Sequence, residues 1–107
     1  MRQPTFQILV ALAHEERHGY GIIRRVATLT EGQVRLGPGT LYGALDRLVG
    51  EGAVVATRTE VVSGRERRYY RLTDSGRETL LAEVERRSAM LDAAREALDL
   101  PPGTATT

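Results

Sequence analysis

Cysteine, lysine and tryptophan are all absent from this chain of 107 residues. Without cysteine the chain has no disulfide, no thiolate metal site and no thiol nucleophile. Without lysine, all 15 basic residues are Arg, whose planar fork suits phosphate and guanine. A length of 107 residues corresponds to one domain with a modest core.

Long hydrophobic runs are missing too. The apolar run at residues 8–13 is too short to span a membrane. His14 and Glu15 follow it, where a signal peptide would need small residues for cleavage. We therefore expect a soluble, cytoplasmic protein with no membrane partner.

The net charge of +1 hides an uneven distribution along the chain. Residues 17–71 hold ten Arg against five acidic residues, a balance of +5. Residues 72–107 hold four Arg against seven acidic residues, a balance of −3. A basic middle and an acidic end are typical of a nucleic-acid surface joined to a segment with another role.

The stretch from Gly37 to Glu51 is predicted to be a helix around which the chain is organised. Its apolar residues at 41, 45, 48 and 49 share one face, and Pro38 suits the first helical position after an N-cap at Gly37. The opposite face carries Thr40, Tyr42, Gly43, Asp46 and Arg47. Such a face fits a DNA major groove about 12 Å wide, although it is equally typical of an ordinary solvated helix.

Two shorter helices are predicted before it, from Pro4 to about Ala13 or His14 and from Tyr20 to Leu29. Residues 15–18 form the connection between them, and glycines at 19 and 21 mark a tight entry into the second helix. Short helices joined by a glycine-containing connection have the outline of a helix-turn-helix.

A β-hairpin is predicted to follow. Residues 54–62 are rich in β-branched side chains, residues 63–66 form the turn, and residues 67–73 alternate so that Tyr70 and Leu72 point inward and Tyr69 outward. The hairpin carries Arg58, Arg65, Arg67, Arg68 and Arg71. Such a hairpin is a candidate wing against the phosphate backbone or minor groove, the alternative being a solvated hairpin whose arginines cover apolar surface.

The last predicted helix is the longest, from a cap at Thr73 to about Leu98. Val84, Leu91 and Leu98 are spaced by seven, and the stripe extends beyond what a compact body of about 70 residues covers. We therefore expect a second copy of the chain to cover it. Two prolines at 101 and 102 end the helix.

Residues 14–18 spell His-Glu-Glu-Arg-His, a literal match to a zinc-protease motif. The extended pattern needs a third histidine at position 24, where Arg24 stands, and neither further histidine nor cysteine is available. Gly19 and Gly21 also indicate that the helix does not run across both histidines. We therefore predict no metal site, no cofactor and no catalytic residues.

The order of elements and several motifs resemble those of the PadR family of bacterial transcriptional regulators. The motifs are His-Gly-Tyr-Gly-Ile at 18–22, Gly-Thr-Leu-Tyr at 39–42, Glu-Gly at 51–52 and Tyr-Tyr-Arg-Leu-Thr at 69–73. The resemblance covers residues 4 to about 98, and the single C-terminal helix is similar to that of the compact subfamily.

The resemblance implies a mainly α fold with a small β-hairpin: a winged helix-turn-helix over residues 1–72, a dimerisation helix over 73–100 and a disordered tail over 101–107. It implies a DNA-binding regulator, a repressor released by a small aromatic or drug-like effector, that acts as a homodimer on a pseudo-palindromic operator. The DNA-binding residues are expected to be Tyr20, Gly39, Thr40, Tyr42, Gly43, Arg47, Gly64, Arg65 and Arg67. The dimerisation residues are expected to be Phe6, Leu9, Leu81, Val84, Leu91, Ala94 and Leu98.

Two departures from the family pattern bear on these expectations. Gly37 stands where the family often has Ser, which removes a hydroxyl contact to phosphate. The lack of tryptophan removes any site that stacks a drug between two indoles. The strongest competing class is a winged-helix module that contacts protein rather than DNA, and the arginines gathered on the helix and hairpin count against it.

Overall fold

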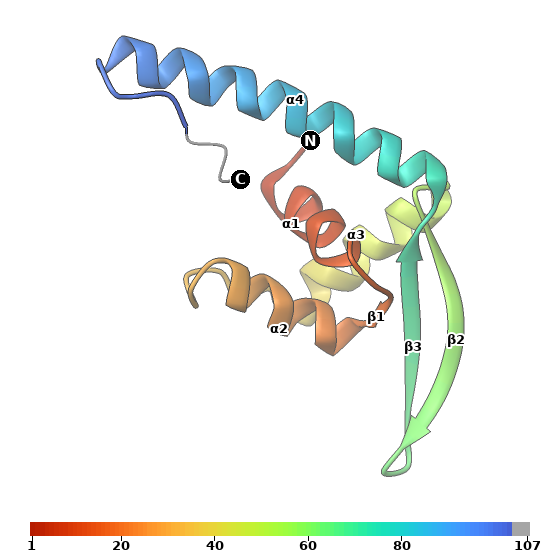
Figure 1. Cartoon of the computed structure of the whole chain (residues 1–107). Helices are drawn as coiled ribbons and strands as arrows, with labels where there is room; N and C mark the ends of the chain where they lie inside the picture. Colours follow the sequence, from red (N-terminus) through yellow and green to blue (C-terminus); the bar gives the residue numbers. More distant parts are fainter. Residues whose placement is uncertain (104–107) are drawn as a thin grey trace.

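The computed structural model describes residues 1–103, which form four helices and a three-stranded sheet (Figure 1). In chain order the elements are α1 (Gln3–Leu12), β1 (Arg17–His18), α2 (Gly19–Leu29), α3 (Pro38–Gly50), β2 (Val54–Val62), β3 (Arg65–Leu72) and α4 (Asp74–Ala97). The predicted mainly α fold with a winged hairpin and a long last helix is confirmed. Within the described part of the chain, no helix is both long and apolar enough to cross a membrane.

The core lies where α1, α2 and α3 meet the base of the hairpin. Its fully buried side chains come from all of these elements: Ile8, Leu9 and Leu12 from α1, Ile22 and Val26 from α2, Leu41 and Leu45 from α3, and Val54 from β2. Burying each large aliphatic side chain contributes about 1.5–3 kcal/mol. The inward faces of all three helices are therefore buried in this core, and only their other faces can contact a partner.

The hairpin extends from this core as a separate arm (Figure 1). β2 and β3 pair antiparallel from Val54↔Leu72 at the base to Val62↔Arg65 at the tip. The turn is only Ser63 and Gly64, with φ of 52° and 77°, as a two-residue type I′ turn requires. The predicted four-residue turn was therefore too long, and residues 65 and 66 belong to β3.

A third strand, β1, was not predicted. Arg17 and His18 pair with Tyr70 and Tyr69, which gives the sheet order β1-β3-β2. Two residues are too short to show an alternating pattern, so only a connection was expected here. The inward position predicted for Tyr70 is confirmed, since its side chain is buried in the core.

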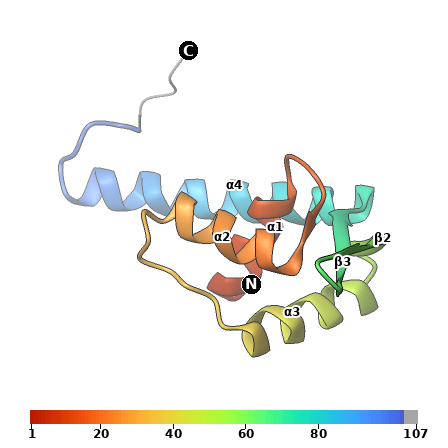
Figure 2. The same ribbon diagram turned by 90° about the horizontal axis from the view of Figure 1, so that it is seen from below.

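α4 begins at a tightly packed junction with the hairpin base. The Thr73 hydroxyl accepts a hydrogen bond from the Gly76 amide at 2.9 Å and donates to the Gly52 carbonyl at 2.6 Å. The predicted cap at Thr73 is thus confirmed. Beyond its first turns α4 continues past the body of the molecule, as Figure 1 and Figure 2 show from two sides. Residues 101–103 follow it without regular structure, and the rest of the predicted tail lies outside the described residues.

Gly76 is the position where this junction leaves no space for a side chain. A Cβ there would lie 1.9 Å from the carbonyl oxygen of Ala53, which is backbone and cannot swing aside. We expect Gly76→Ala to lower the free energy of unfolding by roughly 2 kcal/mol or more, because α4 must move away from the backbone of Ala53, just before β2.

Gly43→Ala is the matched control, since a Cβ at this helical glycine meets nothing within 4 Å. It should raise stability by about 0.5–1 kcal/mol through helix propensity alone. Urea unfolding followed by circular dichroism, at one fixed protein concentration, measures both. Equal stability of the two variants would contradict the junction described here.

Candidate nucleic-acid interface

α3 has a solvent-exposed face opposite a leucine-rich buried face. Leu41, Ala44, Leu45 and Leu48 are buried, and Gly37 caps the helix without a side-chain hydrogen bond. The predicted outward residues Thr40, Tyr42, Gly43, Asp46 and Arg47 are all exposed. The core therefore fixes α3 by its buried face, and the opposite face is accessible to a partner.

Gly39 and Gly43 lie on this exposed face, one turn apart. A Cβ at either position would meet no atom within 4 Å, so packing inside the chain does not require glycine there. Each glycine costs about 0.5–1 kcal/mol relative to alanine in a helix. The helix backbone is left bare on the side where an external surface can approach it closely.

Tyr42 is positioned by Gly19 at the start of α2. A Cβ at Gly19 would lie 2.4 Å from the Tyr42 hydroxyl oxygen and 2.8 Å from its Cζ, so the ring rests directly on the glycine backbone. The Tyr42 side chain is nevertheless 46% exposed. Its neighbour in the predicted site, Tyr20, is 60% exposed and lies beside Arg24, whose Cζ is 5.2 Å from the ring centroid.

A cleft of about 370 Å³ separates these tyrosines from the wing. It is lined by His18, Gly19, Tyr20, Tyr42, Arg65, Glu66, Arg67 and Arg68. The structure thus brings four of the predicted DNA-binding residues together from three elements, while Gly64 stands beyond them at the hairpin tip. Three arginines against one glutamate make this cleft attractive to an anion.

Arg58 belongs to a different arrangement from the other wing arginines. Its Nε donates to Glu16 at 2.7 Å and its Nη1 to Glu60 at 2.8 Å, and its guanidinium lies 3.8 Å from the Tyr69 ring centroid. These hydrogen bonds lower the pKa of both carboxyl groups. Arg58 therefore ties the wing to the segment before β1, which corrects the expectation that it is available to phosphate.

His18 caps α2 and supports the same wing. Its Nδ1 accepts a hydrogen bond from the Gly21 amide at 3.1 Å, and its ring meets Tyr69 edge-on at 5.2 Å. Burial, together with Arg67 and Arg24, lowers the pKa of the imidazole. A lowered pKa keeps Nδ1 unprotonated, as the cap requires.

The zinc-protease motif does not lie on one helix. α1 ends at Leu12, earlier than predicted, and His18 has the capping role just described. Across residues 1–103 no group of three or more His, Cys, Asp or Glu side chains could hold a metal ion.

The residues expected at a dimer interface divide into two groups. Leu81, Val84 and Leu91 on α4 and Leu98 at its C-cap are 43–69% exposed, and Ala94 is exposed as well. Leu9 is fully buried in the core of its own chain, so its assignment to a dimer surface is wrong. Its periodicity with Phe6 placed both on one stripe, but of the two only Phe6 lines the hollow between α1 and α4.

The fold is a winged helix-turn-helix: three helices are followed by a β-hairpin wing and then by a long last helix. A profile described as the transcriptional regulator PadR-like family matches residues 8–82. The chain belongs to this family of transcriptional regulators. Among its relatives, transcriptional regulator Rv3488 of Mycobacterium tuberculosis is 41% identical over 91 residues, 85% of this chain and 78% of that protein.

Solved structures agree with this assignment. PadR of Bacillus subtilis, in complex with operator DNA, superposes with a TM-score of 0.69 at 28% identity, over 78% of this chain and 48% of that chain. A PadR-like transcription factor of Bacteroides fragilis gives a TM-score of 0.69 at 28% identity, over 88% and 87% of the two chains.

The contact between Gly19 and Tyr42 can be tested by a double-mutant cycle on stability. Gly19→Ala should cost about 1–2 kcal/mol in the natural sequence, because the new methyl displaces the tyrosine ring. In a Tyr42→Ala background the methyl enters vacated space and should cost far less. Urea unfolding of the four proteins gives the coupling energy.

Gly21→Ala is the control within the same helical turn. Its Cβ would meet the His18 ring at 3.5 Å, an ordinary contact, so its effect should be the same in both backgrounds. A Gly19→Ala cost that does not depend on residue 42 would show that the ring does not rest there.

Proposed function

We propose that this protein is a cytoplasmic, sequence-specific DNA-binding regulator that acts as a homodimer and represses transcription until a small molecule releases it. The observation that carries the proposal is the exposed face of α3, flanked by an arginine-bearing wing, in a chain of the PadR-like family. One solved relative of this chain is in complex with operator DNA.

The two parts of the surface suit two kinds of contact. A helix that lies in a major groove reads base edges, and here the side chains available for reading are Thr40 and Tyr42. Arginines on an extended hairpin suit phosphate, which carries affinity but little sequence information. α3 is therefore the reader, and Arg65 and Arg67 on the wing are anchors.

The homodimer is supported by the apolar surface of α4. Met90 and Leu91 on α4 and Leu98 at its C-cap are 72%, 61% and 69% exposed, and this helix extends past the body of the chain. Exposed apolar patches of this kind mark association sites in soluble proteins. A second copy packed along α4 would present two α3 helices to one duplex, about one helical turn of 34–36 Å apart or a multiple of it.

The effector is supported by an apolar hollow of about 610 Å³ between α1 and α4. It is lined by Phe6, Val84, Arg87, Ser88, Met90, Leu91 and Ala94. Its size is within the range that holds a small organic molecule, and the proposed dimer would close it further. Repression and release are carried over from the family resemblance.

Substitutions in the reader helix and in the wing anchors should have different effects on DNA binding. Tyr42→Ala or Thr40→Val should lower the ratio of operator to random-DNA affinity, by roughly 1–3 kcal/mol for each base interaction removed. Arg65→Gln or Arg67→Gln should weaken both affinities together and reduce the log–log salt slope by about 0.9 for each phosphate no longer neutralised. Operator fragments come from selection on genomic DNA, and fluorescence anisotropy measures binding.

If wing variants changed sequence preference and helix variants did not, reader and anchor would be reversed. If neither set altered DNA binding, the alternative of a winged-helix module that contacts protein would become the better function.

Leu91→Glu tests the dimer. A carboxylate placed in a buried apolar seam is strongly unfavourable, so sedimentation should detect monomer at concentrations where the natural protein is a dimer. Ala89→Glu adds the same charge on the opposite, exposed face of α4 and should leave the dimer unchanged. An intact dimer in the Leu91 variant would exclude this interface.

A further inference from the structure

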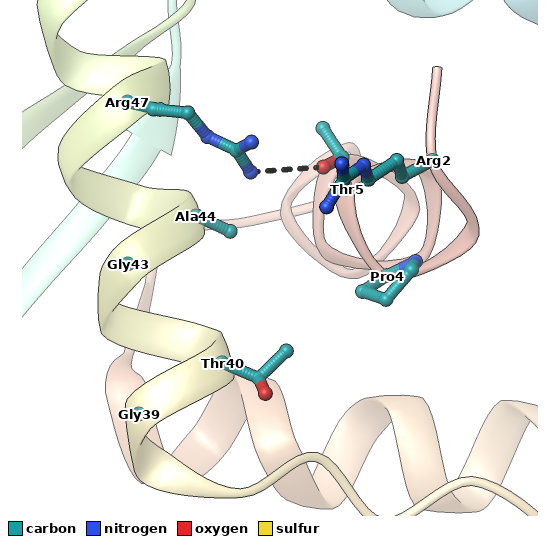
Figure 3. A pocket seen from close by; sticks show the side chains of 8 residues that line it. All are labelled: Arg2, Pro4, Thr5, Gly39, Thr40, Gly43, Ala44 and Arg47. Atoms are coloured by element: carbon teal, nitrogen blue, oxygen red, sulfur yellow. Dashed lines mark hydrogen bonds between the residues drawn. The ribbon is translucent and has the colours of Figure 1, made fainter.

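A second basic hollow lies on the other flank of α3, away from the wing. It has a volume of about 390 Å³ and is lined by Arg2, Pro4, Thr5, Gly39, Thr40, Gly43, Ala44 and Arg47. Figure 3 shows the Arg2 side chain, from the N-cap of α1, and the Arg47 side chain, from α3, reaching into it. Arg2 and Thr5 were not among the residues that the sequence marked for function.

The charged side chains that line this hollow are all positive. Arg2 and Arg47 are its charged lining residues, and neither forms an ion pair with a carboxylate within residues 1–103. Arg47 Nη2 instead donates to the Thr5 hydroxyl at 3.4 Å, which turns its guanidinium toward α1. Two guanidinium groups that converge without a carboxylate repel one another, and an anion between them removes that repulsion.

Glu51 brings a carboxylate to the neighbourhood of these two arginines. It borders an adjoining hollow of about 240 Å³ that Arg2 and Arg47 also line. Its carboxylate is not among the lining groups of the first hollow and pairs with neither arginine. The space beside Thr40 and Gly43 therefore keeps its positive character.

The position of the hollow decides which anion fits it. Tyr42 faces the wing-side cleft, whereas Thr40 and Arg47 lie on the α1 side, roughly 140–160° farther round the helix at 100° per residue. A helix in a major groove has one sugar-phosphate strand on each side of it. The arginines of the wing-side cleft would contact the phosphates of one DNA strand. The Arg2–Arg47 hollow lies on the side of α3 where the other strand would run.

We infer that Arg2 and Arg47 form a second phosphate-binding site, which holds the DNA strand across the major groove from the wing. Thr5 positions Arg47 in this site. The inference rests on the proposed function, and its ligand is a backbone phosphate of the same duplex, bound without regard to sequence. With anchors on both flanks, α3 is fixed across the groove rather than hinged on the wing alone.

The test is the salt dependence of binding to a random-sequence duplex of about 24 base pairs. Arg2→Gln and Arg47→Gln should each lower the log–log slope by about 0.9 for the phosphate that is no longer neutralised, and weaken binding at about 0.1 M salt by at least roughly fivefold. Arg2→Lys keeps the charge and should restore most of the slope. The operator-to-random ratio should remain unchanged, since phosphate contacts carry no sequence information.

Arg95→Gln is the matched control, because it removes the same charge from the last turn of α4, distant from α3 (Figure 1). An equal loss of salt slope and affinity in this variant would show that the effect comes from net charge alone, and would overturn the inference. A changed operator-to-random ratio in Arg2→Gln would indicate that Arg2 contacts a base rather than a phosphate, which would also overturn the inference.

The wing variants separate this inference from the proposed function. If Arg65→Gln and Arg67→Gln flatten the salt slope while Arg2→Gln and Arg47→Gln do not, the second site is absent and DNA binding stands. If all four leave the slope unchanged, DNA binding itself is wrong.

Discussion

The close approach of α4 to the base of the hairpin is the constraint on which the rest of the structure depends. The Thr73 amide donates to the Ala53 carbonyl at 3.0 Å, the Thr73 hydroxyl caps α4, and Gly76 has no room for a side chain. The residues that end the wing therefore also begin α4. No free linker separates the winged domain from the helix proposed to dimerise.

Local pairing, rather than composition, decides what each arginine does. Arg58 is held by two carboxylates and an aromatic ring, and Arg86 and Arg87 share the buried Glu83, whose carboxyl pKa they lower. Arg65 and Arg67 make no ion pair within the described residues. A count of arginines along the sequence treats these groups alike, although the first group is engaged within the chain and the second, in the part of the chain that the structure describes, is not.

The sequence predicted those features that repeat with a regular period or have a fixed local chemistry. The buried face of α3, the extent of β2 and the cap at Thr73 are of this kind. β1 was missed because two residues form a strand only when Tyr69 and Tyr70 are beside them. Leu9 was misplaced because periodicity gives the face of a helix but not which neighbour covers it, and the contact of Tyr42 with Gly19 joins residues that no local pattern connects.

The rigid junction also determines how a signal would travel in the proposed dimer. The proposed effector between α1 and α4 would change how two copies of α4 pack, while the close contact of Gly76 with the Ala53 carbonyl would resist bending of α4 against the hairpin base. A small rotation of α4 in the proposed dimer would therefore be passed to the whole winged domain. The spacing of the two α3 helices would change as a result, and an α3 anchored on both flanks, as proposed, would tolerate little change in spacing before it no longer fitted the duplex.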